Sequence, residues 1–309
     1  MIEMLYQRDV YGKTLVELGK LNKNIVVLDA DLSGSTRTSL FAKAFPERFF
    51  NFGVAEQNMM ATAAGIASCS KIVFVSTFAI FATGRAWDQV RNSVAYNNFD
   101  IKIVATHAGI TAGPDGASHQ ALEDIALMRV IANMNIIVPC DGPQTADAII
   151  SAANNKGPFY IRLGRPKVPT IENKGEFKLG KAQVLIEGDD VAIIACGIMV
   201  AEAIAAAKNL LNKGIKARVI NVHTIKPLDI EAVLKAAKET RGIVVCEEHA
   251  VIGGLASSID EVVAENCPTK VVRLGIRNRF GQSGEPADLL KEYNLTNTDI
   301  EKAALRIVS

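Results

Sequence analysis

Residues 49–60 read Phe49-Phe50-Asn51-Phe52-Gly53-Val54-Ala55-Glu56-Gln57-Asn58-Met59-Met60. The aromatic run predicts a short strand at Phe49–Gly53, and the small residues that continue to Ala67 predict a helix. Glu56 lies at the junction, in a window with almost no other charge. A strand that passes a glycine and enters a helix is the repeating unit of a parallel α/β sheet.

Glu56 has two interpretations. An acid in the first turn of a helix complements the positive end of the helix dipole, which is the commoner reason for an acid at this position. A carboxyl group buried among apolar neighbours would instead have a raised proton affinity and would exchange a proton during catalysis. Taken alone, the stretch favours the first interpretation.

The alternation of strand and helix extends along the first half of the chain. We expect helices at residues 10–21, 37–45, 79–96, 122–132 and 144–154, with Phe78 beginning the third of these. We expect strands at residues 25–28, 71–76, 101–106, 136–138 and 159–163. Continuous apolar strands joined by short connections predict a mostly parallel sheet that is covered by helices on both faces.

A chain of 309 residues is near the upper limit for one hydrophobic core, so two domains are expected. Prolines, glycines and charges gather at residues 166–188, which predicts a linker between a first domain at 1–165 and a second at 189–309. The second domain repeats the α/β pattern. Its expected strands are 191–196, 217–222, 243–246 and 271–274, and its expected helices are 199–212, 230–240, 255–265, 287–292 and 297–305.

Composition excludes several classes of protein. The net charge of +1 gives no electrostatic attraction for nucleic acid or for an anionic membrane surface. No apolar run reaches the length of a bilayer span and no signal peptide is recognisable, so we expect a cytoplasmic protein without a membrane partner. The five cysteines are odd in number and far apart, which favours reduced and mostly buried thiols. The four histidines and these cysteines lack the paired spacing of a structural zinc site.

One connection is too long and too rich in glycine to be a simple link between elements. Residues 107–119 read His107-Ala108-Gly109-Ile110-Thr111-Ala112-Gly113-Pro114-Asp115-Gly116-Ala117-Ser118-His119. Long structured loops in compact domains are usually functional, and histidine exchanges protons near neutral pH. A single histidine more often caps a helix or satisfies a local hydrogen bond, but the pair favours proton transfer or hydroxyl recognition. We expect no catalytic role for His223 or His249, the latter being solvated or at an interface.

Other residues are weaker candidates. Phe78 and Phe81 are typical of core packing, but beside a carboxylate they would form a flat slot for a heteroaromatic ring. Guanidinium and hydroxyl groups at predicted element ends would hold a phosphate, and these are Arg8, Ser33, Ser35 and Arg165. The sequence lacks the glycine-rich dinucleotide fingerprint, the P-loop and the serine nucleophile elbow.

Three motifs in this order and spacing resemble the transketolase family. They are Gly53-Val54-Ala55-Glu56-Gln57, then Ser76-Thr77-Phe78-Ala79-Ile80-Phe81, then Thr106-His107-Ala108-Gly109 with Asp115-Gly116-Ala117-Ser118-His119-Gln120. The resemblance covers essentially the whole chain and implies a pyrimidine-binding domain followed by a transketolase C-terminal domain. Members of the family use thiamine diphosphate and Mg²⁺ to move a two-carbon ketol unit between sugar phosphates.

The resemblance implies a cofactor site. Glu56 would match the glutamate that hydrogen-bonds a ring nitrogen of the aminopyrimidine, where a protonated carboxyl favours the imino tautomer that deprotonates the thiazolium ring. Phe78 and Phe81 would match the aromatic pocket of the pyrimidine, although Gly84 stands where a tyrosine is expected. Asp31 would match a weaker cofactor-binding motif, Asp-Leu-x-x-Ser.

The resemblance also implies a substrate site. His119 would match the catalytic histidine that contacts the C1 hydroxyl and the carbonyl region of the sugar, and Asp115 would match the aspartate that reads hydroxyl stereochemistry. Four donors would match those that hold the substrate phosphate: Arg8, Ser35, His107 and Arg165. Pro166 follows Arg165 where many relatives have glutamine.

A full-length transketolase also carries a diphosphate-binding domain with Gly-Asp-Gly and an asparagine, which this sequence lacks. We therefore expect the C-terminal subunit of a split transketolase, inactive alone, with no metal ligand of its own. A separate N-terminal subunit would supply the Mg²⁺ ligands, and the assembly would be a heterotetramer, a dimer of heterodimers. The second domain is expected to serve assembly.

Three alternatives stay open. Deoxyxylulose-phosphate synthase shares the fold, but such proteins typically read Asp-Arg-Ala-Gly where this chain reads Thr106-His107-Ala108-Gly109. The beta subunit of 2-oxo-acid dehydrogenases has the same two domains but lacks the loop with two histidines. A non-catalytic assembly subunit would have the fold without the chemistry, a possibility to which Gly84 gives a little room.

Overall fold

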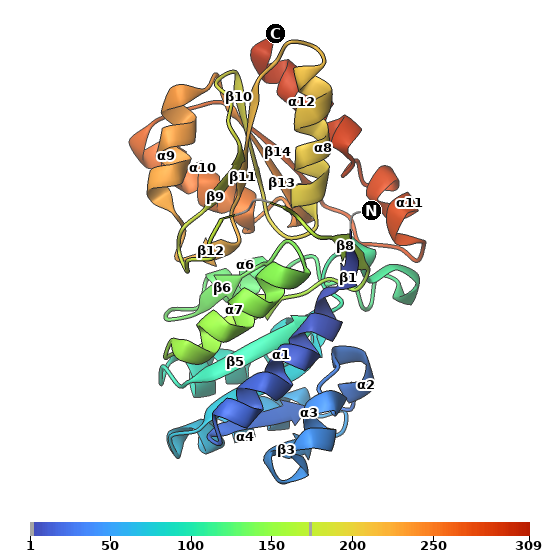
Figure 1. Cartoon of the computed structure of the whole chain (residues 1–309), viewed down its shortest axis with the longest axis vertical. Helices are drawn as coiled ribbons and strands as arrows, with labels where there is room; N and C mark the ends of the chain where they lie inside the picture. The colour runs from blue at the N-terminus through green and yellow to red at the C-terminus, as the bar shows by residue number, and fades with distance from the viewer. Residues whose placement is uncertain (1–2, 173–174) are drawn as a thin grey trace.

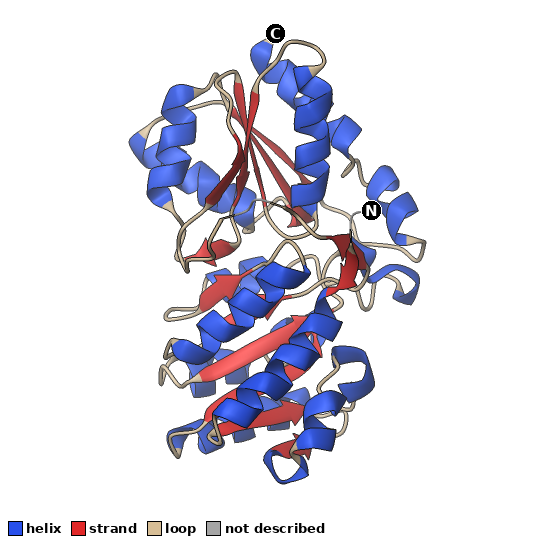
Figure 2. Ribbon diagram, viewed as in Figure 1, coloured by secondary structure: helices blue, strands red, loops and turns tan. Residues whose placement is uncertain are grey.

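The computed structural model describes residues 3–172 and 175–309. Two α/β domains lie end to end, with the N-terminal half of the chain in one and most of the C-terminal half in the other (Figure 1). In each domain a sheet lies between layers of helices, as Figure 2 shows. The predicted fold class is confirmed.

The first domain contains a seven-stranded sheet in which only β12 runs antiparallel to its neighbour. In spatial order its strands are β12 (Thr224–Lys226), β6 (Asn135–Ile137), β7 (Phe159–Arg162), β5 (Ile101–Thr106), β4 (Ile72–Phe78), β2 (Ile25–Asp29) and β3 (Phe49–Asn51). The completely buried β2 and β5 are mostly apolar, with Asp29 and Lys102 as the charged exceptions, which is the pattern of a sheet covered on both faces.

Helices cover both faces of this sheet. One face carries α1 (Gln7–Leu21), α3 (Ser39–Ala44) and α7 (Gly142–Asn154), whose side chains share one buried cluster with those of the strands. The other face carries α4 (Glu56–Ser68), α6 (Asp124–Arg129) and the segment at 79–96. Short turns complete the domain: α2 (Ser33–Thr36), η1 (Pro46–Arg48) and η4 (Ile110–Asp115).

The helix predicted at residues 79–96 differs in two ways. Phe78 does not begin it but ends β4, because its backbone pairs with Thr106 of the neighbouring strand. The segment is also not one regular α-helix. It consists of π-helical turns η2 (Phe81–Arg85) and η3 (Val90–Ala95) around the short α5 (Trp87–Gln89). Apolar spacing does not distinguish π turns from α turns, and π turns often accompany functional sites.

The second domain contains a five-stranded sheet in which only β9 runs antiparallel to its neighbour. Its strands in spatial order are β14 (Val271–Ile276), β13 (Ile243–Ala250), β10 (Val191–Ala195), β11 (Ala217–Asn221) and β9 (Gln183–Ile186). Helices α8 (Met199–Leu211) and α12 (Asn297–Val308) lie on one side of it, and α9 (Ile230–Glu239) and α10 (Leu255–Asn266) lie on the other (Figure 1). The short α11 (Pro286–Glu292) packs against η4 of the first domain.

The expected linker contains two strands, and the second half of the chain contributes one strand to the first sheet. Residues 166–188, where we expect a linker, contain β8 (Lys167–Pro169), which pairs with β1 (Met4–Tyr6), and β9, which belongs to the second sheet. Strand β12, which follows β11 in the chain, pairs with β6 of the first sheet. One buried cluster extends through both domains, so their relative position is fixed by packing as well as by the chain.

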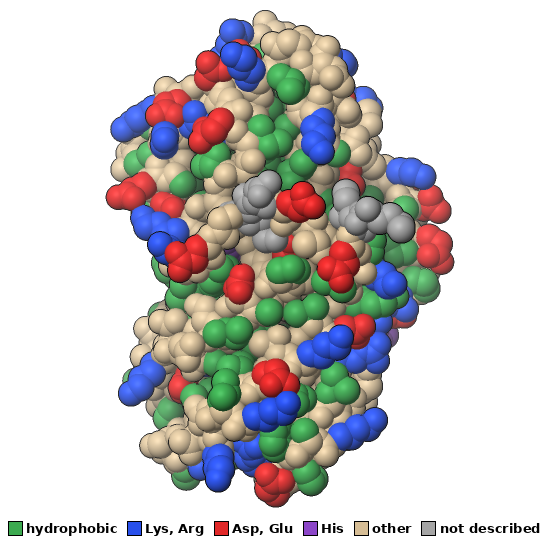
Figure 3. All heavy atoms as spheres, in the orientation of Figure 1, with side chains coloured by type: hydrophobic (Ala, Val, Ile, Leu, Met, Phe, Trp, Pro, Cys, Tyr) green, Lys and Arg blue, Asp and Glu red, His purple; other side chains and the backbone are tan. Residues whose placement is uncertain are grey.

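Charged side chains of both signs are interspersed over the face of the molecule drawn in Figure 3. Cys140, Cys196 and Cys246 are buried, as predicted, whereas Cys69 is exposed. Within residues 3–172 and 175–309 no helix is long and apolar enough to cross a membrane.

Candidate functional site

Glu56 is the first residue of α4, and its side chain is 1% exposed. The guanidinium group of Arg85 pairs with it, since Nη1 donates to the carboxylate Oε2 at 2.9 Å. Arg85 itself is 48% exposed. The Glu56 carboxyl group is therefore in a first helical turn, as the first interpretation states, and buried, as the second requires, but its neighbour is a guanidinium group as well as apolar side chains. Sequence reasoning missed Arg85, and the signal for it was its position four residues after Phe81.

Three aromatic rings and Arg85 continue outward from Glu56. The ring centroids of Phe78 and Phe81 are 6.0 Å apart and their planes are inclined by only 15°. The Arg85 guanidinium lies 4.7 Å from the Phe81 centroid. His119 presents its edge to both phenylalanines, with centroids at 6.2 Å from Phe78 and 5.3 Å from Phe81. A Cβ added at Gly84 would meet no atom within 4 Å, so the position of the missing tyrosine is open.

His107 lies on the other side of Phe78. The two rings stack with centroids 3.9 Å apart, and His107 is 3% exposed. Its Nε2 accepts from Arg8 Nη1 at 3.5 Å, so Nδ1 carries the ring proton and donates to Thr106 Oγ1 at 2.9 Å. Burial, followed by the positive charges of Arg8 and Arg165, lowers the pKa of His107 to about 3. The imidazole is therefore neutral at physiological pH.

Positive charge gathers at this end of the site. Burial first, and then the nearby charges of Arg37 and Arg165 among others, lower the pKa of the Arg8 guanidinium. Arg165 Nη1 lies 3.8 Å from the Asp115 carboxylate and donates to the carbonyl of Ala112. The guanidinium groups of Arg8 and Arg165 are near enough for the charge of Arg165 to lower the pKa of Arg8. Such a pair attracts an anion with tetrahedral oxygens, such as a phosphate.

Asp31 and Ser35 occupy the loop after β2. The buried Asp29 holds this loop, because its carboxylate accepts from the backbone N–H of Leu32 at 2.6 Å and from two threonine hydroxyls at 2.8 Å each. Asp31 is exposed with a left-handed backbone (φ 64°), and its N–H donates to Asn51 Oδ1. In the described ranges no hydrogen bond or ion pair joins Asp31 or Ser35 to the other candidates. Asp31 and Ser35 therefore lie outside the assembled site. The structure brings together the other eight of the ten predicted residues, which are Glu56, Phe78, Phe81, His107, His119, Arg8, Asp115 and Arg165.

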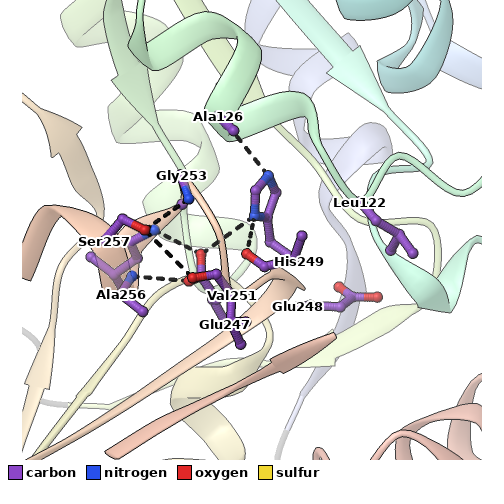
Figure 4. A network of polar contacts seen from close by, with 12 residues as sticks. Leu122, Ala126, Glu247, Glu248, His249, Val251, Gly253, Ala256 and Ser257 are labelled. Carbon is purple, nitrogen blue, oxygen red and sulfur yellow. Dashed lines mark hydrogen bonds and ion pairs between the residues drawn. The ribbon is translucent and has the colours of Figure 1, made fainter. Parts of the chain in front are cut away.

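The second domain reaches the site through β13. Glu247, Glu248 and His249 are 0%, 3% and 0% exposed, so the solvated position considered for His249 is wrong and the interface position is right. His249 Nδ1 donates to the Ala250 carbonyl, and its Nε2 accepts from the N–H of Ala126 in the first domain (Figure 4). Sequence reasoning missed this burial. The signal was a Glu-Glu-His run directly after an apolar strand, without an intervening turn residue.

Glu247 and Glu248 point in different directions from adjacent positions (Figure 4). The Glu247 carboxylate accepts from the N–H groups of Leu255 and Ala256 at the beginning of α10. The Glu248 carboxylate accepts from the N–H of Thr111, which belongs to the loop at 107–119. Burial raises the pKa of Glu248 to about 7.

The described residues contain no group of three or more histidine, cysteine, aspartate or glutamate side chains arranged to hold a metal ion. What they offer is a buried carboxyl group, two phenylalanine rings, two histidines and three guanidinium groups. These suit a heteroaromatic ligand together with an anionic, hydroxyl-bearing one.

Comparison with known proteins gives matches along the whole chain. Residues 3–170 match the family model of the transketolase pyrimidine-binding domain, and residues 180–300 match that of the transketolase C-terminal domain. A Methanocaldococcus jannaschii protein assigned as a transketolase C-terminal section is 51% identical over 96% of this chain and 94% of its own length. A 6-deoxy-6-sulfo-D-fructose transketolase subunit from a Clostridium species is 43% identical over 98% of this chain and 94% of its own.

Among solved structures, a split-gene transketolase in the form of an inactive β4 tetramer superposes with a TM-score of 0.92. Its sequence is 51% identical, and the match covers 98% of each chain.

Proposed function

This chain belongs to the transketolase family, and we propose that it is the C-terminal subunit of a thiamine-diphosphate-dependent enzyme that moves a two-carbon ketol unit between sugar phosphates. One observation carries the proposal. A buried glutamate, two nearly parallel phenylalanine rings and two histidines form a continuous set of contacts that ends in the guanidinium group of Arg8. A subunit retained only for assembly would not need these side chains together.

The residues at the Glu56 end fit the pyrimidine ring of thiamine diphosphate. Glu56 would hydrogen-bond a ring nitrogen, and Phe78 and Phe81 would contact the ring faces. Gly84 leaves open space beside the ring, where the expected tyrosine would have contacted it. When bound, the cofactor supplies the carbon nucleophile on which the two-carbon unit is carried. Because Arg85 is half-exposed, its side chain would move into solvent at a small cost in free energy where the pyrimidine ring takes its place beside Glu56.

At the other end the residues fit a sugar phosphate. Arg8 and Arg165 bind the phosphate, while His119 and Asp115 contact hydroxyl and carbonyl oxygens of the sugar. His107 has a more specific task in this arrangement. Both of its ring nitrogens are engaged, one with Arg8 and one with Thr106, so it orients the Arg8 guanidinium rather than donating to the phosphate itself.

The diphosphate of the cofactor and its Mg²⁺ are assigned to a separate N-terminal subunit, which completes the site in a dimer of heterodimers. Two findings support this part of the proposal. The Clostridium relative is named as a subunit, and the solved relative is described as a split-gene enzyme that is inactive as β4.

Sulfosugars are a second candidate substrate class, because the Clostridium relative is named for one. A sulfonate is tetrahedral and anionic like a phosphate, and guanidinium groups bind both. Arg8 and Arg165 are thus compatible with either head group.

The experiment is a ketol-transfer assay from xylulose 5-phosphate to ribose 5-phosphate with thiamine diphosphate and Mg²⁺. It compares the chain alone with the chain reconstituted with its N-terminal counterpart, and it repeats the assay with 6-deoxy-6-sulfofructose as donor. Transfer by the reconstituted pair only is expected. Transfer by the lone chain would contradict the split site, and transfer from the sulfosugar alone would reassign the substrate.

A further inference from the structure

The loop at residues 107–119, which carries Asp115 and His119, rests on the second domain. The side chain of Ile110 is completely buried in the second domain's core cluster, together with Ile276 and Leu289. The Gln120 amide, at the end of the loop, donates to the carbonyls of Ile110 and Gly113 within it and of Gln282 in the second domain. The conformation of this loop is therefore determined by both domains.

Two glycines of the loop mark where the second domain approaches most closely. A Cβ at Gly109 would lie 2.2 Å from Glu248 Cδ, and one at Gly116 would lie 2.6 Å from Ser283 Oγ. Both glycines also have φ angles near +80°, at +82° and +76°, which other residues rarely adopt. Glycine at these positions lets the loop lie directly on the second domain.

Glu248 makes the most specific of these contacts. Its carboxylate Oε1 accepts from the N–H of Thr111 at 2.5 Å and lies against the backbone of Gly109. Its own backbone is fixed as well, because Arg162 Nη2 donates to the Glu248 carbonyl at 2.9 Å. The Arg162 guanidinium is in turn paired with the buried Asp124 at 2.7 Å.

A buried carboxyl group at this position is costly to keep. The positive charge of Arg162 acts to lower the pKa of Glu248, but this guanidinium is already paired with Asp124, and the opposing effect of burial is larger. Packing alone would be served by an apolar side chain of similar size. What an apolar side chain would not supply is an acceptor for the N–H of Thr111.

We propose that Glu248 is a positioning residue for the site loop: by accepting from Thr111 and lying against Gly109, it sets the loop conformation that presents Asp115 and His119. The second domain then takes part in catalysis indirectly, beyond the assembly role expected for it. The structural part of this inference stands on the contacts of the single chain. Its catalytic consequence rests on the proposed function.

The structural part is tested by hydrogen exchange of the lone chain, which requires no activity. Glu248→Ala removes the acceptor, and amide exchange in peptides covering residues 108–119 is expected to accelerate about 10- to 100-fold, the range for losing one buried hydrogen bond. Glu248→Gln keeps an acceptor oxygen and is expected to exchange like the wild type. Glu247→Gln is the matched control, because it is the adjacent buried glutamate and should change exchange only at the beginning of α10.

A second variant keeps the test decisive if Glu248→Ala does not fold. Gly109→Ala places a methyl group against the Glu248 carboxylate and should accelerate exchange in the same loop peptides. Unchanged loop exchange in a folded Glu248→Ala or Gly109→Ala protein would overturn the inference. So would equal acceleration in Glu248→Gln and Glu248→Ala.

The catalytic part is tested in the reconstituted pair. Glu248→Ala is expected to lower kcat, because the loop presents Asp115 and His119, and Glu248→Gln is expected to restore kcat. Altered loop exchange with unchanged kcat would refute the catalytic consequence alone. Absence of transfer even in the wild-type pair would refute the proposed function and leave the exchange result standing.

Discussion

Two buried glutamates, one on each domain, bracket the candidate site and have opposite kinds of partner. Glu56 is 1% exposed, but its partner is the guanidinium group of Arg85, which is half in solvent. Glu248 is 3% exposed, and its partner is the N–H of Thr111, in the buried part of the loop. The first partner is easily displaced by a ligand, whereas the second is not.

Burial of a carboxyl group does not by itself identify its role. A side-chain partner at the surface leaves the carboxyl group available to a ligand, as chemistry requires. A backbone partner in a buried part of a loop instead makes the carboxyl group one of the contacts that fix the loop conformation. The same substitution, glutamate to glutamine, should therefore have different consequences at the two positions.

The largest effect is expected at Glu56. Glu56→Gln in the reconstituted pair should lower the rate of ketol transfer about 10²- to 10⁴-fold, the usual range for losing an acid–base group, because the amide does not exchange a proton with the cofactor ring. Circular dichroism and loop hydrogen exchange should match those of the wild type. A variant that retains near-normal transfer would show that Glu56 has no such role.

A smaller effect is expected at the phosphate end. Arg8→Ala should raise the KM for phosphorylated substrates about 10- to 100-fold, the range for losing a hydrogen bond to a charged group, with little change in kcat. Steady-state kinetics with ribose 5-phosphate and with unphosphorylated ribose as acceptors separate the two cases. Equal losses with both acceptors would show that Arg8 does not bind the phosphate.

The pH dependence of stability tests the burial of the Glu248 carboxyl group. The folded-state pKa of about 7 lies above the ordinary value of 4.5, so the native state binds more protons, and the free energy of unfolding falls as pH rises through this window. Glu248→Gln removes that loss, and its Tm should exceed the wild type's at pH 8 but not at pH 4. The charged and titratable groups around Glu248 include Arg162, Asp124, Glu247, His249 and Cys196, all of which the variant leaves in place. A Tm difference that is the same at both pH values would contradict this assignment.

The smallest effect on transfer is expected at Arg85. Its guanidinium is half-exposed, but Glu56 is buried, so Arg85→Ala leaves the carboxyl group without its cation and should lower the free energy of unfolding by about 1–3 kcal/mol. The affinity of the reconstituted pair for thiamine diphosphate should not fall, since the variant leaves Glu56 open to the ring. Isothermal calorimetry measures it, and a markedly weaker affinity would show that Arg85 contacts the cofactor.

Much of the fold could be predicted from the sequence, because the long elements depend on local pattern. The expected strand at 101–106 has the bounds of β5, and the helices at 10–21 and 255–265 differ from α1 and α10 by a few residues. The short strands β1, β8, β9 and β12 escaped prediction, since each has only three or four residues and lies outside the strand–helix alternation that indicated the equally short β3 and β6. Strands of this length exist through tertiary pairing rather than through propensity.

The candidate site was predictable to a similar extent and for similar reasons. The residues that share a motif, such as Phe78 with Phe81 and His107 with His119, lie together in the structure. Arg85 and Glu248 were not predicted, because their partners are 29 and 137 residues away in the chain. No local pattern indicates such contacts.

The most direct test of the account places the same substitution at both glutamates. Ketol transfer from xylulose 5-phosphate to ribose 5-phosphate is measured for the reconstituted wild-type pair and for pairs carrying Glu56→Gln or Glu248→Gln. Glu56→Gln should lower transfer about 10²- to 10⁴-fold while Glu248→Gln retains it, because only Glu56 must exchange a proton. Equal rates in the two variants, whether both high or both low, would contradict the division of roles between the two domains.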